Sequence, residues 1–383
     1  MSSRVSAVVD LGAIHRNLDV VTGLAGAAAV MAVVKADAYG HGTGPVARTA
    51  RRHGVDWLGV ALPTEALALR ALGDEGRILA WLWAPGDPAI AACVRAGIDL
   101  SVSGSWALAE VCEAAAAVRS TARVHLKIDS GLTRNGVAAA EWLPFLDDVA
   151  EAAAAGLVDV EGIWSHLADS DVRGSATVAA QADRFREAVD QAAALGIHPR
   201  LRHLSNSGGL WLHPDCRFDM VRCGIAMYGL SPGPDVGTAA DLGLTPAMTL
   251  RSQLVNIKAI DAGTSVSYGS TWTAAVPTVV GLVPAGYADG VPRAAGNRME
   301  VAIGGVRRRI VGRLAMDQFV IDVGTGVRPS IGDEVYLFGP GRHGEPTADE
   351  WAAALDTIGY EIVTRIGPRV AREYIPLGPG GAA

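Results

Sequence analysis

The sequence predicts an α/β protein in which an N-terminal (β/α)8 barrel of the TIM type is followed by a mostly β C-terminal domain. Two observations lead to this prediction. Up to Gly229, short β-type runs alternate eight times with longer helical patterns rich in Ala, Leu and Arg, and eight units in a stretch of this length fit a closed barrel better than an open sheet. Beyond Gly229, short β-rich runs alternate with glycine-containing turns, which indicates a separate β domain.

The expected barrel elements follow one another along the chain. Strands are expected at Val30–Val34, Trp57–Ala61, Arg77–Leu82, Asp99–Val102, Val124–Asp129, Val160–Ser165, Leu201–Ser205 and Asp219–Arg222. Helices are expected between them, for example at Thr64–Ala71, Ser105–Val118, Trp142–Ala155 and Ala176–Leu195. Asp10 is expected to cap a first helix, because Ile14 and Leu18 follow it at helical spacing.

A Pro/Gly-rich linker, SPGPDVG at 231–237, separates the two expected domains. We expect residues 1–230 to form the barrel and residues 241–383 to form the β domain, and residues 1–10 are candidates for pairing with the latter. The β-rich runs of the second domain are Ala247–Ile260, Thr278–Pro284, Met299–Ile303, Gln318–Val323 and Glu334–Phe338, with one helix at Thr347–Leu355.

The composition excludes several classes of protein. Forty acidic residues against 33 basic ones give a formal net charge of −7, which argues against nucleic acid or an anionic membrane as a partner. No apolar run reaches the ~18 residues of a membrane span, and the first residues lack the apolar segment of a secretory signal, so we expect a cytoplasmic location. The four cysteines form no CxxC pair and lie at no metal-type spacing from a histidine, so no metal site is expected.

Lysine is rare in this chain. Only three of the 33 basic residues are lysines, namely Lys35, Lys127 and Lys258. Since Arg supplies positive charge almost everywhere, a remaining Lys is a candidate for a task that Arg cannot perform, such as losing its proton and acting as a nucleophile.

Two of these lysines lie where active sites of such barrels are found, at the C-terminal ends of strands. Lys35 follows the first expected strand and Lys127 lies near the end of the fifth. His166, His203 and Arg222 lie at later strand ends. A single such histidine is more often a structural residue, but two rare lysines together with Arg222 favour a functional site.

The loops after the last two barrel strands carry groups that suit a phosphate. They are Ser205–Gly209, which includes Asn206 and Ser207, and Cys223–Ala226. Hydroxyls, glycines and backbone N–H groups are the donors that bind phosphate oxygens. A lysine able to form a Schiff base, opposite a phosphate site, points to pyridoxal 5′-phosphate (PLP) as the cofactor.

Several segments resemble the signature motifs of the alanine racemase family. They are VKADAYGHG (34–42), KIDSGLTRNG (127–136), WSHLA (164–168), HLSNS (203–207), VRCGIAMYG (221–229), VSYG (266–269), GYADG (286–290), GRLAMDQ (312–318) and YEI (360–362). They cover nearly the whole chain in order. The resemblance implies a PLP barrel and a β domain working as a head-to-tail homodimer, which interconverts L-alanine and D-alanine, a peptidoglycan precursor.

The resemblance also implies residue roles. Lys35 would bind PLP as a Schiff base and act as one base, and Tyr268 from the partner subunit's β domain would act as the other. The remaining cofactor-binding residues would be Tyr39, Asn206, Ser207, Gly224, Ile225 and Tyr360 around the phosphate, His166 beside the pyridine ring and Arg222 at its nitrogen. The substrate carboxylate would be held by Arg134 and by the partner's Met316, and the entryway lined by Tyr287.

The implied roles of the two bases and of Arg222 agree with the chemistry of racemisation. Inverting an α-carbon needs a base on each face, one to remove a proton and one to return it. Arg222, whose pKa ordinarily exceeds about 12, would keep its proton and leave the ring nitrogen unprotonated. The coenzyme would then be a weaker electron sink, which favours return of the proton over transamination.

Lys127 is the unusual member of the set. An unmodified ammonium would repel Arg134, seven residues further on. Some members of the family carry a carbamylated lysine at this position, and we hypothesise the same here. The alternative is an ordinary barrel lysine paired with Asp129.

Other functions are alternatives to alanine racemisation. A broader-specificity or serine-type racemase would keep the same residues. A PLP amino-acid decarboxylase should show a Gly-rich phosphate loop and a Cys-containing acidic motif near the C-terminus, and neither is present. A metal-dependent barrel hydrolase should show an HxH pair, which the nine histidines do not form. We expect Trp81, Trp83 and Trp164 to pack in the barrel rather than to contact substrate.

Overall fold

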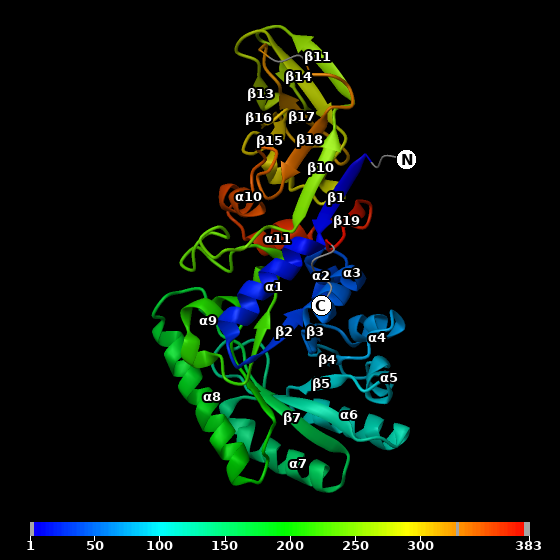
Figure 1. Cartoon of the computed structure of the whole chain (residues 1–383), viewed down its shortest axis with the longest axis vertical. Coiled ribbons are helices and arrows are strands. Elements are labelled where there is room, and N and C mark those ends of the chain that lie inside the picture. The colour runs from blue at the N-terminus through cyan, green and yellow to red at the C-terminus, as the bar shows by residue number, and fades with distance from the viewer. Residues whose placement is uncertain (1–3, 327–328, 379–383) are drawn as a thin grey trace.

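The computed structural model describes residues 4–326 and 329–378. In this part of the chain, eight parallel strands form one sheet in the order β8-β7-β6-β5-β4-β3-β2-β9 (Figure 1). The strands are β2 (Ala29–Val33), β3 (Trp57–Val60), β4 (Arg77–Ala80), β5 (Asp99–Val102), β6 (Ala122–Lys127), β7 (Val158–Trp164), β8 (Leu201–His203) and β9 (Met220–Cys223). All eight predicted barrel strands are therefore confirmed.

The sheet closes into a barrel between its two outermost strands, β8 and β9. The Asp219 N–H donates to the Arg202 carbonyl over 3.0 Å, and the Arg222 N–H donates to the Ser205 carbonyl over the same distance. The first bond joins β8 to the residue before β9, and the second joins the loop after β8 to the end of β9. The closure therefore brings Ser205 and Arg222, from different strand ends, against each other at the mouth of the barrel.

Helices surround the barrel. They are α1 (Leu11–Ala25), α2 (Lys35–Tyr39), α3 (Thr43–His53), α4 (Pro63–Ala71), α5 (Ala89–Arg95), α6 (Ser105–Val118), α7 (Trp142–Ala154), α8 (Ala176–Ala194) and α9 (Ser207–Leu212). The predicted cap of the first helix is confirmed, because Asp10 Oδ1 accepts from the Ala13 N–H over 2.9 Å. Ile14 and Leu18 of α1 are fully buried, as its apolar spacing predicted.

The C-terminal part forms a nine-stranded sheet in the order β11-β14-β17-β16-β15-β18-β10-β1-β19. The strands are β1 (Val5–Asp10), β10 (Met248–Gln253), β11 (Asn256–Ile260), β14 (Thr278–Val283), β15 (Glu300–Ile303), β16 (Val306–Val311), β17 (Phe319–Asp322), β18 (Glu334–Phe338) and β19 (Ala371–Ile375). A small second sheet pairs β12 (Ser265–Val266) with β13 (Trp272–Thr273). The predicted fold class, a barrel followed by a mostly β domain, is confirmed.

One predicted β-rich run in this domain forms two separate strands. Residues 247–260 contain β10 and β11, which lie at different places in the sheet. The chain changes neighbours at Leu254 and Val255, whose N–H groups bond to the Asp333 and Leu282 carbonyls, respectively. Hydrophobic alternation alone does not show such a change of partner.

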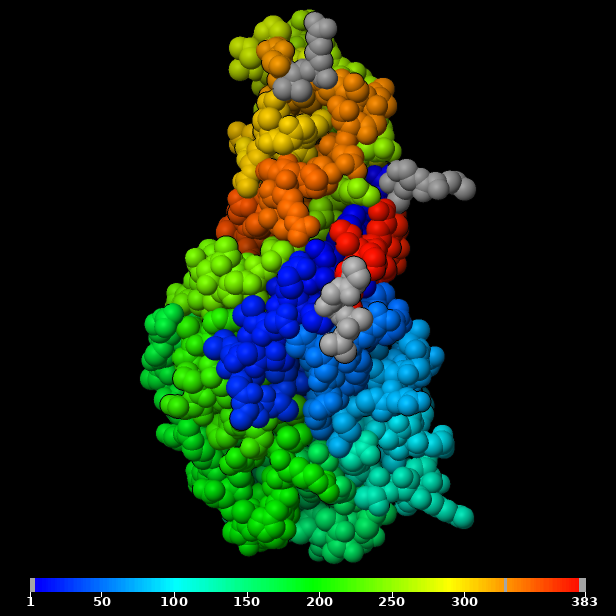
Figure 2. All heavy atoms as spheres, viewed as in Figure 1, coloured from blue at the N-terminus to red at the C-terminus, as the bar shows by residue number. Residues whose placement is uncertain are grey.

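The first strand of the chain belongs to the C-terminal sheet. β1 pairs antiparallel with β10 and parallel with β19, and it leads directly into α1 of the barrel. Helices α10 (Ala348–Leu355) and α11 (Gly359–Thr364) lie where the two parts meet. Figure 2 shows that the molecule is elongated and that the β domain lies at one end of the barrel. Within residues 4–326 and 329–378, no helix combines the length and apolar character that a membrane crossing requires.

Candidate active site

A cavity of about 830 Å³ lies at the C-terminal ends of the barrel strands. Most of the site residues expected from the sequence line it, although they come from distant segments. They are Lys35, Tyr39, Lys127, Arg134, His166, Asn206, Ser207, Arg222, Gly224, Ile225 and Tyr360. Tyr360 lies on α11, so the cavity is completed by a helix from the C-terminal part of the chain.

Lys35 stands at the start of a left-handed turn. β2 ends at Val33, and the four residues 36–39 that follow Lys35 all have φ between 51° and 54°, with no glycine among them. Left-handed backbone costs roughly 1–2 kcal/mol for each such residue. Strain of this kind persists only where surrounding contacts impose it, and it is concentrated at functional sites.

Side chains from both sides hold this turn in place. Glu65 Oε1 accepts from the Ala36 N–H over 2.7 Å. The buried ring of His41 places Nδ1 3.1 Å from the Ala38 carbonyl and 2.9 Å from the Tyr39 carbonyl. Since carbonyls only accept, Nδ1 carries the proton and donates. The turn thus aims Lys35 and Tyr39 into the cavity from a fixed backbone.

The environment of Lys35 favours its neutral form. Burial lowers the pKa of the amine, the positive charge of Arg134 lowers it further, and Glu65 offsets part of this effect. A neutral amine is the form that attacks a carbonyl carbon or accepts a proton. The site therefore supplies the activated lysine that Schiff-base chemistry needs.

Arg222 is a buried part of the cavity wall and is bonded at two of its nitrogens. Nη1 donates to the His203 carbonyl over 2.8 Å, and Nη2 donates to the Ser165 and Leu204 carbonyls over 2.7 and 3.0 Å. Nη2 also lies 3.2 Å from His166 Nδ1. These contacts fix the plane of the guanidinium. Burial lowers the pKa of Arg222 to about 9, which differs from the ordinary value assumed from the sequence, but the group stays protonated at pH 7.

Lys127 lies in a strongly electropositive corner. Its ammonium nitrogen sits 4.3 Å from the centre of the Trp164 ring. Burial lowers its pKa to about 7, and the charges of Arg222 and Arg134 contribute in the same direction. Asp129, the partner in the alternative interpretation, turns its Oδ1 to the N–H groups of the following loop instead. Near neutral pH a large part of Lys127 is therefore unprotonated.

The far side of the cavity has the donors expected of a phosphate site. The Gly224 N–H donates to Ser207 Oγ over 3.1 Å, which joins the two loops after β8 and β9, and Asn206 caps α9. A Cβ at Gly224 would clash with the Tyr39 hydroxyl, so only glycine fits there. Burial raises the pKa of both Tyr39 and Tyr360. Both phenols keep their protons and can donate to an anion.

Comparison with known proteins agrees with this geometry. A family model described as "Alanine racemase, N-terminal domain" matches residues 9–232, and one described as "Alanine racemase, C-terminal domain" matches residues 247–374. The chain belongs to the alanine racemase family. Both the predicted family and the predicted class of enzyme, an isomerase that racemises an amino acid, are thereby confirmed.

Relatives within this family match over nearly their whole length. The alanine racemase of Frankia casuarinae is 51% identical over 372 residues, which is 97% of this chain and 96% of the relative. Among solved structures, alanine racemase from D-cycloserine-producing Streptomyces lavendulae superposes with a TM-score of 0.97 at 47% identity, covering 100% of both chains. The alanine racemase of Streptomyces coelicolor A3(2) gives a TM-score of 0.95 at 50% identity, over 97% of this chain and 98% of the other.

Three expected site residues lie on the β domain, outside the cavity of their own chain. Tyr268 is 71% exposed, Met316 is 54% exposed and Tyr287 is 42% exposed. The backbone on both sides of Tyr268 is strained, with φ of 63° at Ser267 and 46° at Ser270. A large aromatic side chain held at the surface between strained residues, as Tyr268 is, differs from an ordinary surface residue.

Hydrogen bonds connect the loops that carry these three residues. Ser267 Oγ, beside Tyr268, donates to the Arg313 carbonyl over 2.6 Å. The Ala288 N–H, beside Tyr287, donates to the Met316 carbonyl over 2.9 Å. The loops around Tyr268, Met316 and Tyr287 are thus connected to one another, and none of these three residues lines the cavity of its own chain.

The sequence did not assign the tryptophans to the site. Trp81, Trp83 and Trp106 all line the cavity, and Trp83 and Trp106 lie edge to face with ring centres 6.4 Å apart. Trp164 lines it as well, while its Nε1 donates to Ser101 Oγ over 2.9 Å. These tryptophan rings therefore both pack in the barrel and line the cavity. Their positions at or just beyond the ends of barrel strands were the feature of the sequence that could have placed them at the cavity.

Proposed function

We propose that this chain is a PLP-dependent alanine racemase that interconverts L-alanine and D-alanine. The observation that carries the proposal is the convergence on one cavity of an activated lysine, a set of neutral phosphate donors and a buried arginine. Lys35, Ser207 and Arg222 come from three different strand ends. Membership of the alanine racemase family supports the same conclusion.

The residues present fit PLP. Lys35 would hold it covalently, the hydroxyls of Tyr39, Ser207 and Tyr360 would bind its phosphate, and His166 would lie beside its ring. Gly224 has no side chain and lies close to the Tyr39 hydroxyl. The cavity wall at this point is therefore backbone, which suits phosphate oxygens. When bound, PLP supplies an electron-withdrawing ring that acidifies the α-proton of an attached amino acid.

Arg222 would tune that acidity. Its guanidinium keeps all of its protons at pH 7, even though burial lowers its pKa to about 9. It can therefore only donate a hydrogen bond toward a ring nitrogen, and it does not protonate that nitrogen. Moderate electron withdrawal favours quick return of the proton to the α-carbon and so favours racemisation.

The second base would come from the partner subunit. Lys35 approaches the substrate from its own barrel, and we assign the opposite face to Tyr268 of the partner subunit, with Met316 of the partner subunit beside Arg134 at the substrate carboxylate and Tyr287 at the entryway. The exposure of Tyr268 and Met316 on connected loops supports this assignment. A head-to-tail homodimer gives two equivalent sites.

Lys127 would be carbamylated. A neutral lysine amine adds to CO2, forming an N–C bond and releasing one proton, and the product carries a negative charge. The lowered pKa of Lys127, about 7, makes the neutral amine available. The resulting anion would stabilise Arg134 and Arg222, whereas an ammonium repels both. The alternative of an ion pair with Asp129 is disfavoured by the hydrogen bonds that Asp129 already makes.

A racemisation assay on the holoenzyme tests the proposal. L-Alanine, L-serine and a cationic amino acid are each supplied, and the appearance of the D-enantiomer is followed. The proposal predicts the highest kcat/KM for alanine. Turnover of serine or of the cationic substrate at an equal kcat/KM would point to a broader-specificity or serine-type racemase, and loss of CO2 from the substrate would point to a decarboxylase.

Mixing two inactive variants tests the shared site. Lys35→Ala and Tyr268→Phe should each lack activity as homodimers. After subunit exchange, a mixed dimer has one site in which both substitutions are present and one in which neither is, so an equal mixture should recover about a quarter of the wild-type activity. No recovery, with exchange verified by mass spectrometry of differently tagged chains, would mean that both bases come from one chain.

A further inference from the structure

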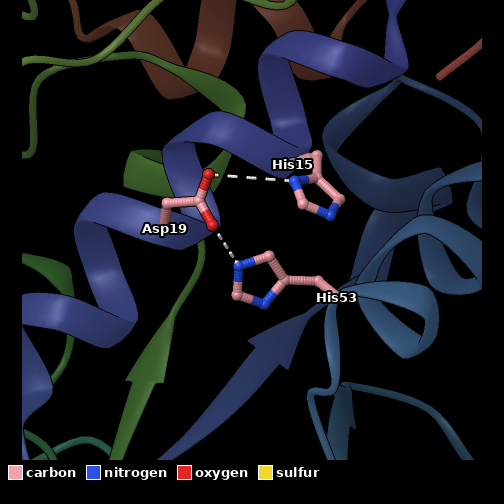
Figure 3. Close-up of side chains that lie close together, drawn as sticks. All are labelled: His15, Asp19 and His53. Carbon is pink, nitrogen blue, oxygen red and sulfur yellow. Dashed lines mark hydrogen bonds and ion pairs between the residues drawn. The ribbon is translucent and has the colours of Figure 1, made fainter. Parts of the chain in front are cut away.

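A cluster of potential metal ligands lies outside the active site, between two helices of the outer layer. His15 and Asp19 occupy positions i and i+4 on one face of α1, and His53 is the last residue of α3. Figure 3 shows both imidazole rings directed at the carboxylate of Asp19. The active-site cavity contains none of the three residues, and the proposed reaction does not use them.

The ligand atoms are close enough for one ion. His53 Nε2 lies 2.9 Å from Asp19 Oδ1, and His15 Nδ1 lies 3.8 Å from Asp19 Oδ2. All three ligand atoms lie within 4.8 Å of one another. Zn–N and Zn–O bonds of roughly 2.0–2.2 Å place tetrahedral ligands about 3.4 Å apart, so each side chain would move by less than about 1 Å.

The surroundings also suit a cation. The imidazoles are the more buried ligands, with His53 10% and His15 23% exposed, while Asp19 is 61% exposed and leaves room for water. His53 lies at the C-terminal end of α3, where the helix dipole is negative. The neighbouring cation, Arg16, is turned toward Asp10 at 3.6 Å. Arg16 is thus drawn away from the point where the three ligands meet.

We propose that His15, Asp19 and His53 form a site for a divalent transition-metal ion of the Zn²⁺ type. Two imidazoles and one carboxylate are a ligand set that such ions prefer, and water would complete the coordination. The ion would clamp α1 to α3. These helices precede and follow the β2–Lys35 segment, so the clamp would brace the barrel wall from which Lys35 projects.

Titration with Zn²⁺ tests this site. The holoenzyme is first treated with a chelator that is then removed, and Zn²⁺ binding is measured by calorimetry together with the thermal unfolding midpoint. The wild type should bind one Zn²⁺ per chain at this site and should show a raised midpoint, because an ion that binds only the folded state stabilises it. His53→Ala and the nearly isosteric Asp19→Asn should lose both effects.

The matched control is His198→Ala, which removes an exposed histidine elsewhere on the barrel and should keep both effects. Racemase activity of each variant reports that it is folded, since the cluster lies outside the cavity. Co²⁺ gives a second readout, because its visible d–d bands should appear in the wild type and disappear in His15→Ala. The proposal is overturned if the wild type shows no midpoint shift, or if Asp19→Asn and His53→Ala retain the wild-type stoichiometry and shift.

Discussion

Nη1 of Arg222 lies 3.1 Å from Nδ1 of His203, and this contact fixes the proton positions of a chain that crosses the barrel. A protonated guanidinium only donates, so His203 Nδ1 accepts and Nε2 carries the proton. His203 Nε2 then donates to His125 Nδ1 over 2.9 Å, and His125 Nε2 donates to Asp99 Oδ2 over 3.3 Å. Burial lowers the pKa of His203 well below its usual range, which is consistent with a neutral ring. The active-site arginine is thereby connected to a buried carboxylate.

Asp99→Asn should destabilise the protein in a pH-dependent way. Burial alone would raise the pKa of Asp99, but the hydrogen bond from His125 and the ion pair with Arg77 outweigh it, so the pKa lies below its usual value. A lowered carboxyl pKa adds stability above about pH 4, and this stability is lost as the pH falls toward the folded-state pKa. We expect a loss of about 3 kcal/mol in the free energy of unfolding at pH 7, and a smaller loss at about pH 3, below the ordinary carboxyl pKa.

The control for Asp99→Asn is Asp183→Asn, which removes an exposed pair with Arg186 and should change stability by less than about 0.5 kcal/mol. Urea unfolding at both pH values measures the two variants. A loss for Asp99→Asn that is the same at pH 7 and at about pH 3 would refute the electrostatic explanation.

Ala36→Gly should stabilise the protein. The φ of Ala36 is 54°, and removing its Cβ relieves about 1 kcal/mol of left-handed strain. In Ala116→Gly, the same change on the exposed face of the right-handed helix α6 should instead cost about 0.5–1 kcal/mol. Thermal unfolding of the two variants gives the comparison. A destabilisation of equal size in both would show that the turn after Lys35 is not strained.

Lys127 should carry a carbamate that depends on pH. With ¹³C-labelled bicarbonate, the wild type should give a carbamate ¹³C resonance that is absent in Lys127→Ala and present in Lys258→Ala. Because the lowered pKa of Lys127 is about 7, the neutral amine is depleted below pH 7, and the signal should fall as the pH is lowered through that range. A resonance that survives in Lys127→Ala would assign the modification to another residue.

Much of the fold could be predicted because its signals are local. Buried parallel strands are short apolar runs between helical patterns, and Asp10 is a polar residue just before an amphipathic run. The division between β10 and β11 could not be predicted, because both are β-type runs and the change of partner depends on strands that are distant in sequence. The same limit applies to His15 and His53, which meet only when α3 packs on α1.

The site was partly predictable for a related reason. Lys35 and Arg222 stand out as unusual residue types at strand ends, where a closed barrel brings side chains together. Residues 36–39 of the left-handed turn after Lys35 include no glycine to signal it, and hydrogen bonds to Glu65 and His41, which lie elsewhere in the sequence or just beyond the turn, support it. The chain from Arg222 to Asp99 also depends on ring orientations inside the barrel, which no sequence pattern contains.

The central claim is that Lys35 and the partner's Tyr268 act on opposite faces of the α-carbon, with Tyr268 taking the proton of the L-enantiomer. The most direct measurement is loss of the α-deuteron from L- and D-[2-²H]alanine in the Tyr268→Phe holoenzyme, followed by NMR. The claim predicts that D-alanine still exchanges its deuteron with solvent without inversion, while L-alanine keeps its own. Equal exchange from both enantiomers, or continued racemisation, would contradict it.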